Sequence, residues 1–266
     1  MKFLLSNTSD FSEEDISHID NLTLVDKWIL NEAFILQNSI QKNYEEFKFH
    51  QIVQDVQNFC TVHLGGYYLD IIKDRLYTSK TDGDARKASQ FVCHSILKMM
   101  NIWVAPILSF TSEEVYGHIN GKKLDSVFLV EWPKQVITIS KKEKDIGGIL
   151  FSLKQLAAKK LDEARNKDVI GSSLDATIYL TVDKKIYTLL EEYKDELKFI
   201  FITSNCILQK IDSDGKTEIR IEKNDHTKCE RCWHRNETVG SVKDHPGLCS
   251  RCHENVYLNG EKRQLG

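Results

Sequence analysis

The stretch Cys229-Glu-Arg-Cys232, with its counterpart Cys249-Ser-Arg-Cys252, decides how the last forty residues of this chain fold. Sixteen residues separate the two Cys-x-x-Cys pairs. Each pair places two thiolates on one tight turn, and the loop between them allows the second turn to complete a tetrahedral site. Because four sulfur ligands leave no open position for water, the spacing predicts one structural zinc ion and no catalytic metal.

Other interpretations of these cysteines are weaker. Two disulfides would need an oxidising compartment and would leave an odd set of three cysteines, Cys60, Cys93 and Cys206, in apolar contexts. A redox Cys-x-x-Cys motif occurs once, at the start of a helix, and not as a matched pair. The neighbouring His234 and His253 are not needed, since four cysteines already fill the coordination sphere.

Composition limits the classes of protein to consider. The chain has 266 residues, enough for two domains, and a net charge of −3, so any attraction to nucleic acid must be local. The apolar start ends at Ser6, and the longest apolar run, 102–110, contains Pro106 and Ser109. Neither segment fits an export signal or a membrane span. With reduced cysteines and no export signal, we expect a cytoplasmic protein that does not associate with membranes. We also expect it to be a monomer.

The first 120 residues follow a helical pattern. Apolar residues recur at helical spacing over 22–40 and over 49–72, and a third helix follows the turn at 81–84. Gly65-Gly66 interrupts the second run at a cost of about 2 kcal/mol in helix propensity, which indicates a kink or a close helix crossing. A capping box is expected at Thr111-Ser-Glu-Glu114. These features predict an antiparallel helix bundle.

The middle of the chain changes pattern. A helix is expected at about 146–167, and strands are expected at 176–182, 199–211 and 217–222 because apolar and polar residues alternate there. The predicted fold class is therefore mainly α: an antiparallel helix bundle, a small α+β junction domain and a four-cysteine zinc module. The sequence places these three domains at residues 1–135, 136–225 and 226–266.

Several segments together resemble the C-terminal part of a bacterial-type isoleucyl-tRNA synthetase, a class I enzyme. The resemblance covers essentially the whole chain. The matching segments are Gly66-Tyr-Tyr-Leu-Asp-Ile-Ile-Lys-Asp-Arg-Leu-Tyr77, Trp103-Val-Ala-Pro-Ile-Leu-Ser-Phe-Thr-Ser-Glu-Glu-Val115, Ala164-Arg-Asn-Lys-Asp-Val-Ile-Gly-Ser-Ser-Leu174, and Cys229-Glu-Arg-Cys-Trp-His234 with Leu248-Cys-Ser-Arg-Cys252. The first two would also fit the valyl and leucyl relatives, whereas the Cys-x-Arg-Cys-Trp-His knuckle favours the isoleucyl enzyme.

The resemblance implies recognition of tRNA(Ile) through its anticodon arm, within an enzyme that attaches isoleucine to that tRNA using ATP. The His-Ile-Gly-His and Lys-Met-Ser-Lys-Ser elements of the family's catalytic domain are absent from this sequence. We therefore assign no catalytic residue and expect the chain alone to be inactive. A separate N-terminal catalytic half is an expected partner.

Four residues of the zinc module are candidates for contact with tRNA: Arg231, Trp233, Arg235 and Arg251. Residues 226–266 carry seven lysines and arginines against five acids. Arg231 and Arg251 lie inside the knuckles, where a metal would hold their backbones in place. Trp233 offers either a stacking surface for an unpaired base or the hydrophobic plug of a module without its own core, and both interpretations remain open.

In the helical region, Lys73, Arg75 and Lys80 are the further candidates for contact with tRNA. Arginine grips phosphate with two hydrogen bonds and stacks on bases, so Arg75 is favoured. The alternative for Lys73 and Lys80 is that cations at the C-terminal end of a helix simply offset its dipole.

Two other functions fit parts of the sequence. A base-excision glycosylase has a finger with the same four-cysteine spacing, but its catalytic N-terminal proline and glutamate are replaced here by Lys2 and Phe3. A standalone RNA- or protein-docking module, which binds a separate catalytic half, is compatible with the tRNA-binding role.

Overall fold

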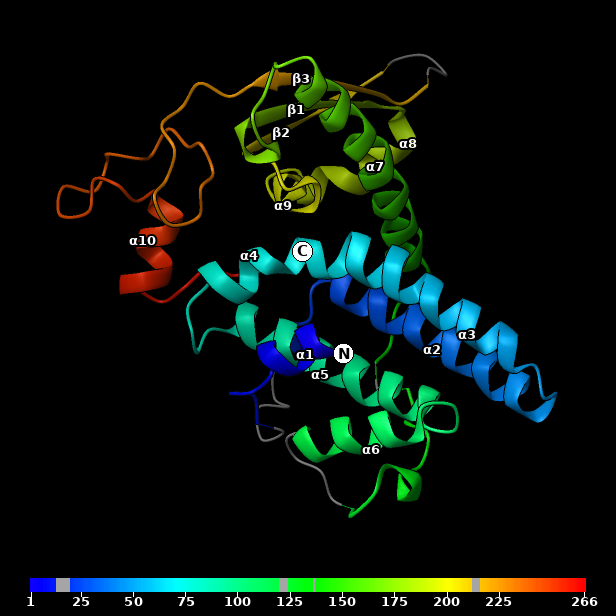
Figure 1. Ribbon diagram of the computed structural model, residues 1–266. Coiled ribbons are helices and arrows are strands. Elements are labelled where there is room, and N and C mark those ends of the chain that lie inside the picture. Colours follow the sequence, from blue (N-terminus) through cyan, green and yellow to red (C-terminus); the bar gives the residue numbers. More distant parts are fainter. Residues whose placement is uncertain (13–19, 120–123, 136, 212–215) are drawn as a thin grey trace. The chain divides into compact units, whose positions relative to one another are not determined.

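The computed structural model describes residues 1–12, 20–119, 124–135, 137–211 and 216–266 (Figure 1). The chain forms two compact units, one made of Met1–Asp70 with Asp84–Ile139, and one made of Ile71–Gly83 with Ser140–Gly266. The predicted fold class, a helical bundle with a small α+β part and a four-cysteine cluster, is confirmed. The division into three domains stays a prediction, and its first boundary, at Val136, lies outside the described residues.

The first unit, called here the helical unit, is built of helices in its described residues. Its helices are α1 (Lys2–Asn7), α2 (Leu24–Glu45), α3 (Phe49–Asn58), the π-helix η2 (Phe59–Leu69), α5 (Asp84–Val104), α6 (Ser109–His118) and the 3-10 turn η3 (Val127–Leu129). None of the helices in the described part of the chain is long and apolar enough to cross a membrane.

Helix α2 is the centre of this unit and packs against α3, η2 and α5. It begins with a capping box, in which the Thr23 side chain accepts from the Asp26 backbone and the Asp26 carboxylate accepts from that of Thr23. The Tyr68 hydroxyl donates to Asp26 Oδ1 at 2.6 Å. Trp103, on α5, is fully buried, and its indole donates to Gln37 on α2. These contacts join α2 to η2 and to α5.

The glycine pair lies in a π-helix, where each turn is wider than in an α-helix. A Cβ added to Gly65 would lie 2.9 Å from the carbonyl oxygen of Cys60, and one on Gly66 would lie 3.1 Å from that of Thr61. The glycines are therefore explained by the close approach of the backbone carbonyls five residues earlier. The helix is therefore irregular at this pair, as expected, but the irregularity is a π-helical segment.

The second unit contains a small sheet and the cysteine-rich end of the chain. Its elements are α4 (Asp70–Thr78, from Ile71 onward), α7 (Lys141–Asn166), η4 (Ser173–Asp175), β1 (Ala176–Val182), α8 (Lys184–Leu190), η5 (Glu191–Tyr193), α9 (Leu197–Phe201), β2 (Asn205–Lys210), β3 (Glu218–Lys223) and α10 (Ser250–Tyr257).

The sheet has the order β2-β1-β3, with β2 parallel and β3 antiparallel to β1. Ile178, Leu180 and Val182 of β1 are fully buried, and α7, α8 and α9 pack against the sheet (Figure 1). Tyr179 lies on the other face, where its ring contacts the guanidinium of Arg220, its partner on β3. The alternation predicted for 176–182 therefore identifies the buried face correctly.

Three local predictions need correction. The expected strand at 199–211 begins only at Asn205, because 197–201 form helix α9, which ends at Ile202 in the left-handed conformation. Helix α7 begins at Lys141, five residues before the expected start, because Ser140 and Glu143 form a capping box. The expected box at Thr111 is absent, because α6 already begins at Ser109 and places Thr111 inside the helix.

Candidate metal centre

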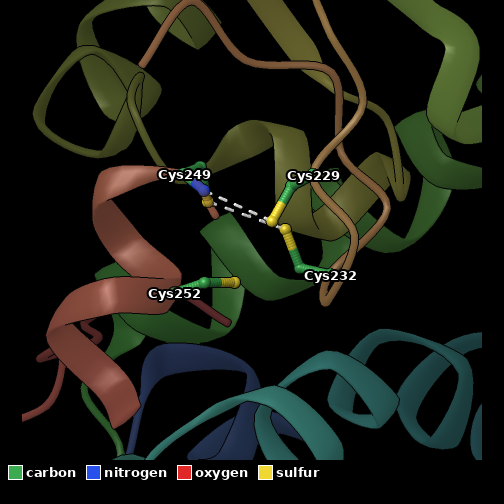
Figure 2. Close-up of side chains that lie close together, drawn as sticks. All are labelled: Cys229, Cys232, Cys249 and Cys252. Atoms are coloured by element: carbon green, nitrogen blue, oxygen red, sulfur yellow. Dashed lines mark hydrogen bonds between the residues drawn. The ribbon is translucent and has the colours of Figure 1, made fainter. Parts of the chain in front are cut away.

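The structure brings the four predicted cysteines together. The sulfur atoms of Cys229, Cys232, Cys249 and Cys252 all lie within 4.8 Å of one another, and all four residues are buried (Figure 2). Among the described residues, they form the only group of three or more potential metal ligands. The predicted ligand set therefore converges on one point from two separate turns.

Local backbone structure places each pair. At the first knuckle, the backbone N–H of Cys229 donates to the carbonyl of His234. The backbone N–H of Trp233 donates to the carbonyl of Cys229. At the second, Cys249 caps the N-terminus of α10 and Cys252 lies in its first turn. The backbone of Glu230 donates to Gly247, which ties the two knuckles together.

The geometry fits zinc. Four sulfurs bound tetrahedrally at about 2.3 Å from the metal would lie about 3.8 Å apart, and Cys232 Sγ lies 3.8 Å from Cys249 Sγ. The backbone N–H of Cys249 donates to Cys229 Sγ at 3.4 Å, a contact that supports a thiolate. Its hydrogen bond with Cys232 lowers the pKa of Cys249 to about 3, whereas contact with Cys232 raises the pKa of Cys252. Zinc binds the thiolate form of cysteine, so metal binding here would release protons from the four thiols.

The two neighbouring histidines have other contacts. His234 is buried, with its ring 5.7 Å from that of Phe199, and burial lowers its pKa. His253 lies beside the rings of His245 and Tyr257.

A partly buried ion cluster joins the zinc module to α4. Asp74 on α4 accepts two hydrogen bonds from Arg251, at 2.6 and 2.9 Å, and one from Arg263 at 2.7 Å. Burial alone would raise the pKa of Asp74, but Arg251 and Arg263 outweigh it and hold that pKa well below its ordinary value. Charged groups out of water are stable only when paired in this way.

Glu261 completes the cluster from the C-terminal segment. It accepts from Arg263 Nε at 2.8 Å, from Asn255 at 2.9 Å and from Ser79 at 3.1 Å. The Arg263 guanidinium also lies 3.3 Å from the centre of the Phe199 ring. Asp74, Glu261 and Arg263 were not predicted as functional. The run Glu261-Lys262-Arg263 has no periodic signal, and Asp74 lies far from it in sequence.

The predicted RNA-contact residues of the zinc module differ in accessibility. Trp233 is 60% exposed and adopts a left-handed backbone conformation, with Lys228 Nζ 5.4 Å from its ring. Arg231 donates to the carbonyl of Thr78. Arg235 Nε donates to Asp175 at 2.7 Å, and Arg251 is held by Asp74. The three arginines are thus engaged within the second unit, whereas the indole is exposed.

The predicted residues of the α4 region also differ. Arg75 is fully buried, so its guanidinium does not lie on the surface as expected for a phosphate-binding group. Lys80 donates to the carbonyl of Leu258 at 3.1 Å, and Lys73 is exposed. By their contacts, all three belong to the same compact unit as the zinc module.

Two known families match this chain, one over its helical region and the start of the sheet and one over its cysteine-rich end. Residues 26–180 match the anticodon-binding domain of tRNA ligase, and residues 228–255 match the zinc finger found in FPG and IleRS. Because the first match covers more than half of the chain, the protein belongs to the family of tRNA ligase anticodon-binding domains.

Several curated proteins similar to this chain carry the name isoleucine–tRNA ligase. The chain is 38% identical to the isoleucine–tRNA ligase of Alcanivorax borkumensis over 276 residues, which cover 98% of this chain and 29% of the relative. It is 38% identical to that of Ruthia magnifica subsp. Calyptogena magnifica, covering 100% of this chain and 30% of the relative. The corresponding protein of Shewanella pealeana is 36% identical over 99% of this chain. The chain thus spans about 30% of the length of these relatives, matching their C-terminal part.

Proposed function

We propose that this chain recognises tRNA(Ile) through the anticodon arm, as the C-terminal part of an isoleucine–tRNA ligase. The observation that carries the proposal is the presence, in one chain, of the anticodon-binding domain and of the zinc finger with its four cysteines converged. A base-excision glycosylase shares the finger alone, so the match at residues 26–180 favours the ligase.

The complete enzyme would attach isoleucine to tRNA(Ile) with ATP, and this chain would contribute binding without the chemical step. Activity would therefore need a catalytic part, present in the same protein or as a separate partner. One structural zinc ion would be held by Cys229, Cys232, Cys249 and Cys252, and a cytoplasmic monomer fits this role. Co-purification with a free catalytic part, or restoration of its activity, would test the partnership.

Within the zinc module, Trp233 is the proposed contact with an unpaired base. Its indole is 60% exposed, and the knuckle hydrogen bond from its own N–H to Cys229 fixes its backbone. An aromatic ring that is exposed and held in place loses little conformational entropy when a base stacks on it. Lys73 is exposed and remains a proposed phosphate contact. Lys80, Arg231 and Arg251 would act indirectly, by holding the α4 segment to the zinc module. Arg235 would hold that module to the start of the sheet, and the buried Arg75 would support α4 itself.

Filter-binding titration of the purified chain tests the function. Wild-type protein should bind tRNA(Ile) more tightly than the same tRNA with an altered anticodon, and chelation of zinc should abolish that preference. Trp233→Ala should weaken binding by about 1–3 kcal/mol, the usual contribution of one stacked base. Trp233→Phe is the matched control and should retain much of the affinity. Equal affinity for all tRNAs at every salt concentration would refute the proposal.

A further inference from the structure

A second basic surface lies in the same unit, away from the zinc centre. A groove of about 1020 Å³ opens between the N-terminal turns of α7 and α8. Four lysines line it, Lys141 and Lys142 from α7 and Lys184 and Lys185 from α8, together with Asp145, Asp183, Thr188 and Leu189. All four lysines are exposed. We refer to this feature as the lysine groove.

The positive charge of the lysine groove is only partly neutralised. Asp183 caps α8 by accepting from the Ile186 backbone at 2.9 Å, and Lys142 pairs with Glu192 at 3.6 Å. Within the described ranges, no carboxylate lies within ion-pair distance of Lys141, Lys184 or Lys185. The N-terminus of the 26-residue helix α7 adds its partial positive charge. The groove is therefore suited to an anion.

The sheet separates the lysine groove from the zinc module. The zinc module is bonded to the start of the strands, where the Arg235 backbone donates to Ser204 and its side chain donates to Asp175. Helix α8 follows directly after the end of β1. Seven residues of strand extend about 20 Å, and the Tyr179–Arg220 pair lies on the face between the two ends. A single ligand that contacts both the zinc module and the lysine groove must therefore span about 20 Å and carry negative charge at the groove.

We propose that the lysine groove binds the phosphodiester backbone of the RNA whose unpaired bases meet the zinc module. This inference rests on the proposed function, since it assumes that the ligand is tRNA. Lysine acts on phosphate as a point charge without reading the base, so the groove would supply affinity and orientation, and sequence preference would come from elsewhere.

A pair of double variants of the full chain tests the proposal. Lys184→Gln with Lys185→Gln removes two groove charges, and Lys159→Gln with Lys160→Gln removes two exposed charges from the far half of α7. Binding to tRNA(Ile), with normal and altered anticodons, is measured from low to high salt. The groove variant should lower the salt slope by about 1 per lysine and weaken binding about tenfold at low salt, equally for both tRNAs. The control should match wild type.

Other results would overturn the inference. An unchanged salt slope in the groove variant, with anticodon preference intact in wild type, would refute RNA binding by the lysine groove. The proposed function would not be affected by that result. Equal losses in both double variants would mean that only total charge matters. Inorganic phosphate, titrated at constant ionic strength, gives a further check. If it competes with tRNA at millimolar concentration for wild type and for the groove variant alike, the groove is not the RNA backbone site. Loss of anticodon preference in wild type itself would instead count against the proposed function.

Discussion

The helical unit and the zinc module are stabilised by different means. The helical unit buries large side chains along whole helices, with Ile29, Ile96 and Trp103 fully inaccessible. The interior of the zinc module is the four cysteines, with only Val239 and Leu248 packed against them as apolar neighbours among the described residues. The first arrangement depends on apolar area removed from water, and the second would depend on a metal held by the cysteines and on partly buried ion pairs. One chain can therefore lose order in one part while the other part keeps its fold.

Removal of zinc should have the largest effect and should be local. Structural zinc contributes about 10–16 kcal/mol of apparent binding free energy in small fingers, far more than Val239 and Leu248 can replace. After chelation, hydrogen exchange should become fast over 226–257 and stay slow in α2 and α5. Cys249→Ser should reproduce the effect, and Cys60→Ser, the matched control, should bind one zinc ion like wild type. Slow exchange of the module without metal would contradict this account.

Asp74→Asn should have the next largest effect. The amide keeps the size of the carboxylate but removes one of the two acids that neutralise Arg251 and Arg263, so that only Glu261 remains. Breaking a fully buried ion pair costs about 3–5 kcal/mol, and the loss of the partly buried Asp74 charge should cost up to that amount. Urea unfolding followed by hydrogen exchange should show the loss in the second unit. Glu163→Gln, which breaks the exposed pair with Lys160, is the control and should leave the unfolding free energy unchanged. Similar stability of both variants would mean that the ion cluster does not hold α4 to the zinc module.

Gly65→Ala should have the smallest effect, confined to the helical unit. The new methyl would lie 2.9 Å from the Cys60 carbonyl oxygen, and overpacking of this kind costs about 1–3 kcal/mol. Part of that cost is offset by the better helix propensity of alanine. Gly117→Ala in α6 has open space around it and should be neutral or stabilising by up to about 1 kcal/mol. Thermal unfolding of the two variants distinguishes them, and a stabilising Gly65→Ala would show that the π-helix readily relaxes.

Local signals in the sequence predicted much of the fold. The spacing of Trp28, Ile29 and Ile40 identified a buried helix face, and the alternation over 176–182 identified a buried strand face. Element boundaries were predicted less well. The capping boxes at Thr23 and Ser140 set two helix starts, whereas the similar motif at Thr111 caps nothing because the preceding turn is already helical. A capping motif thus marks a helix start only where the chain before it is extended.

The sequence by itself determined the predicted ligand set. The spacing of the two Cys-x-x-Cys pairs is enough to recognise four ligands, and no distant contact is needed. Only the tertiary structure decided the roles of the basic residues. Lysines and arginines look alike along a sequence, but their availability depends on which carboxylate folds beside them. Arg251 and Arg263 meet Asp74, which lies 177 and 189 residues away from them in the chain. Lys184 and Lys185 meet no such partner within the described residues. The sequence shows which residues are charged, but only the folded structure shows which of those charges are neutralised by a neighbour.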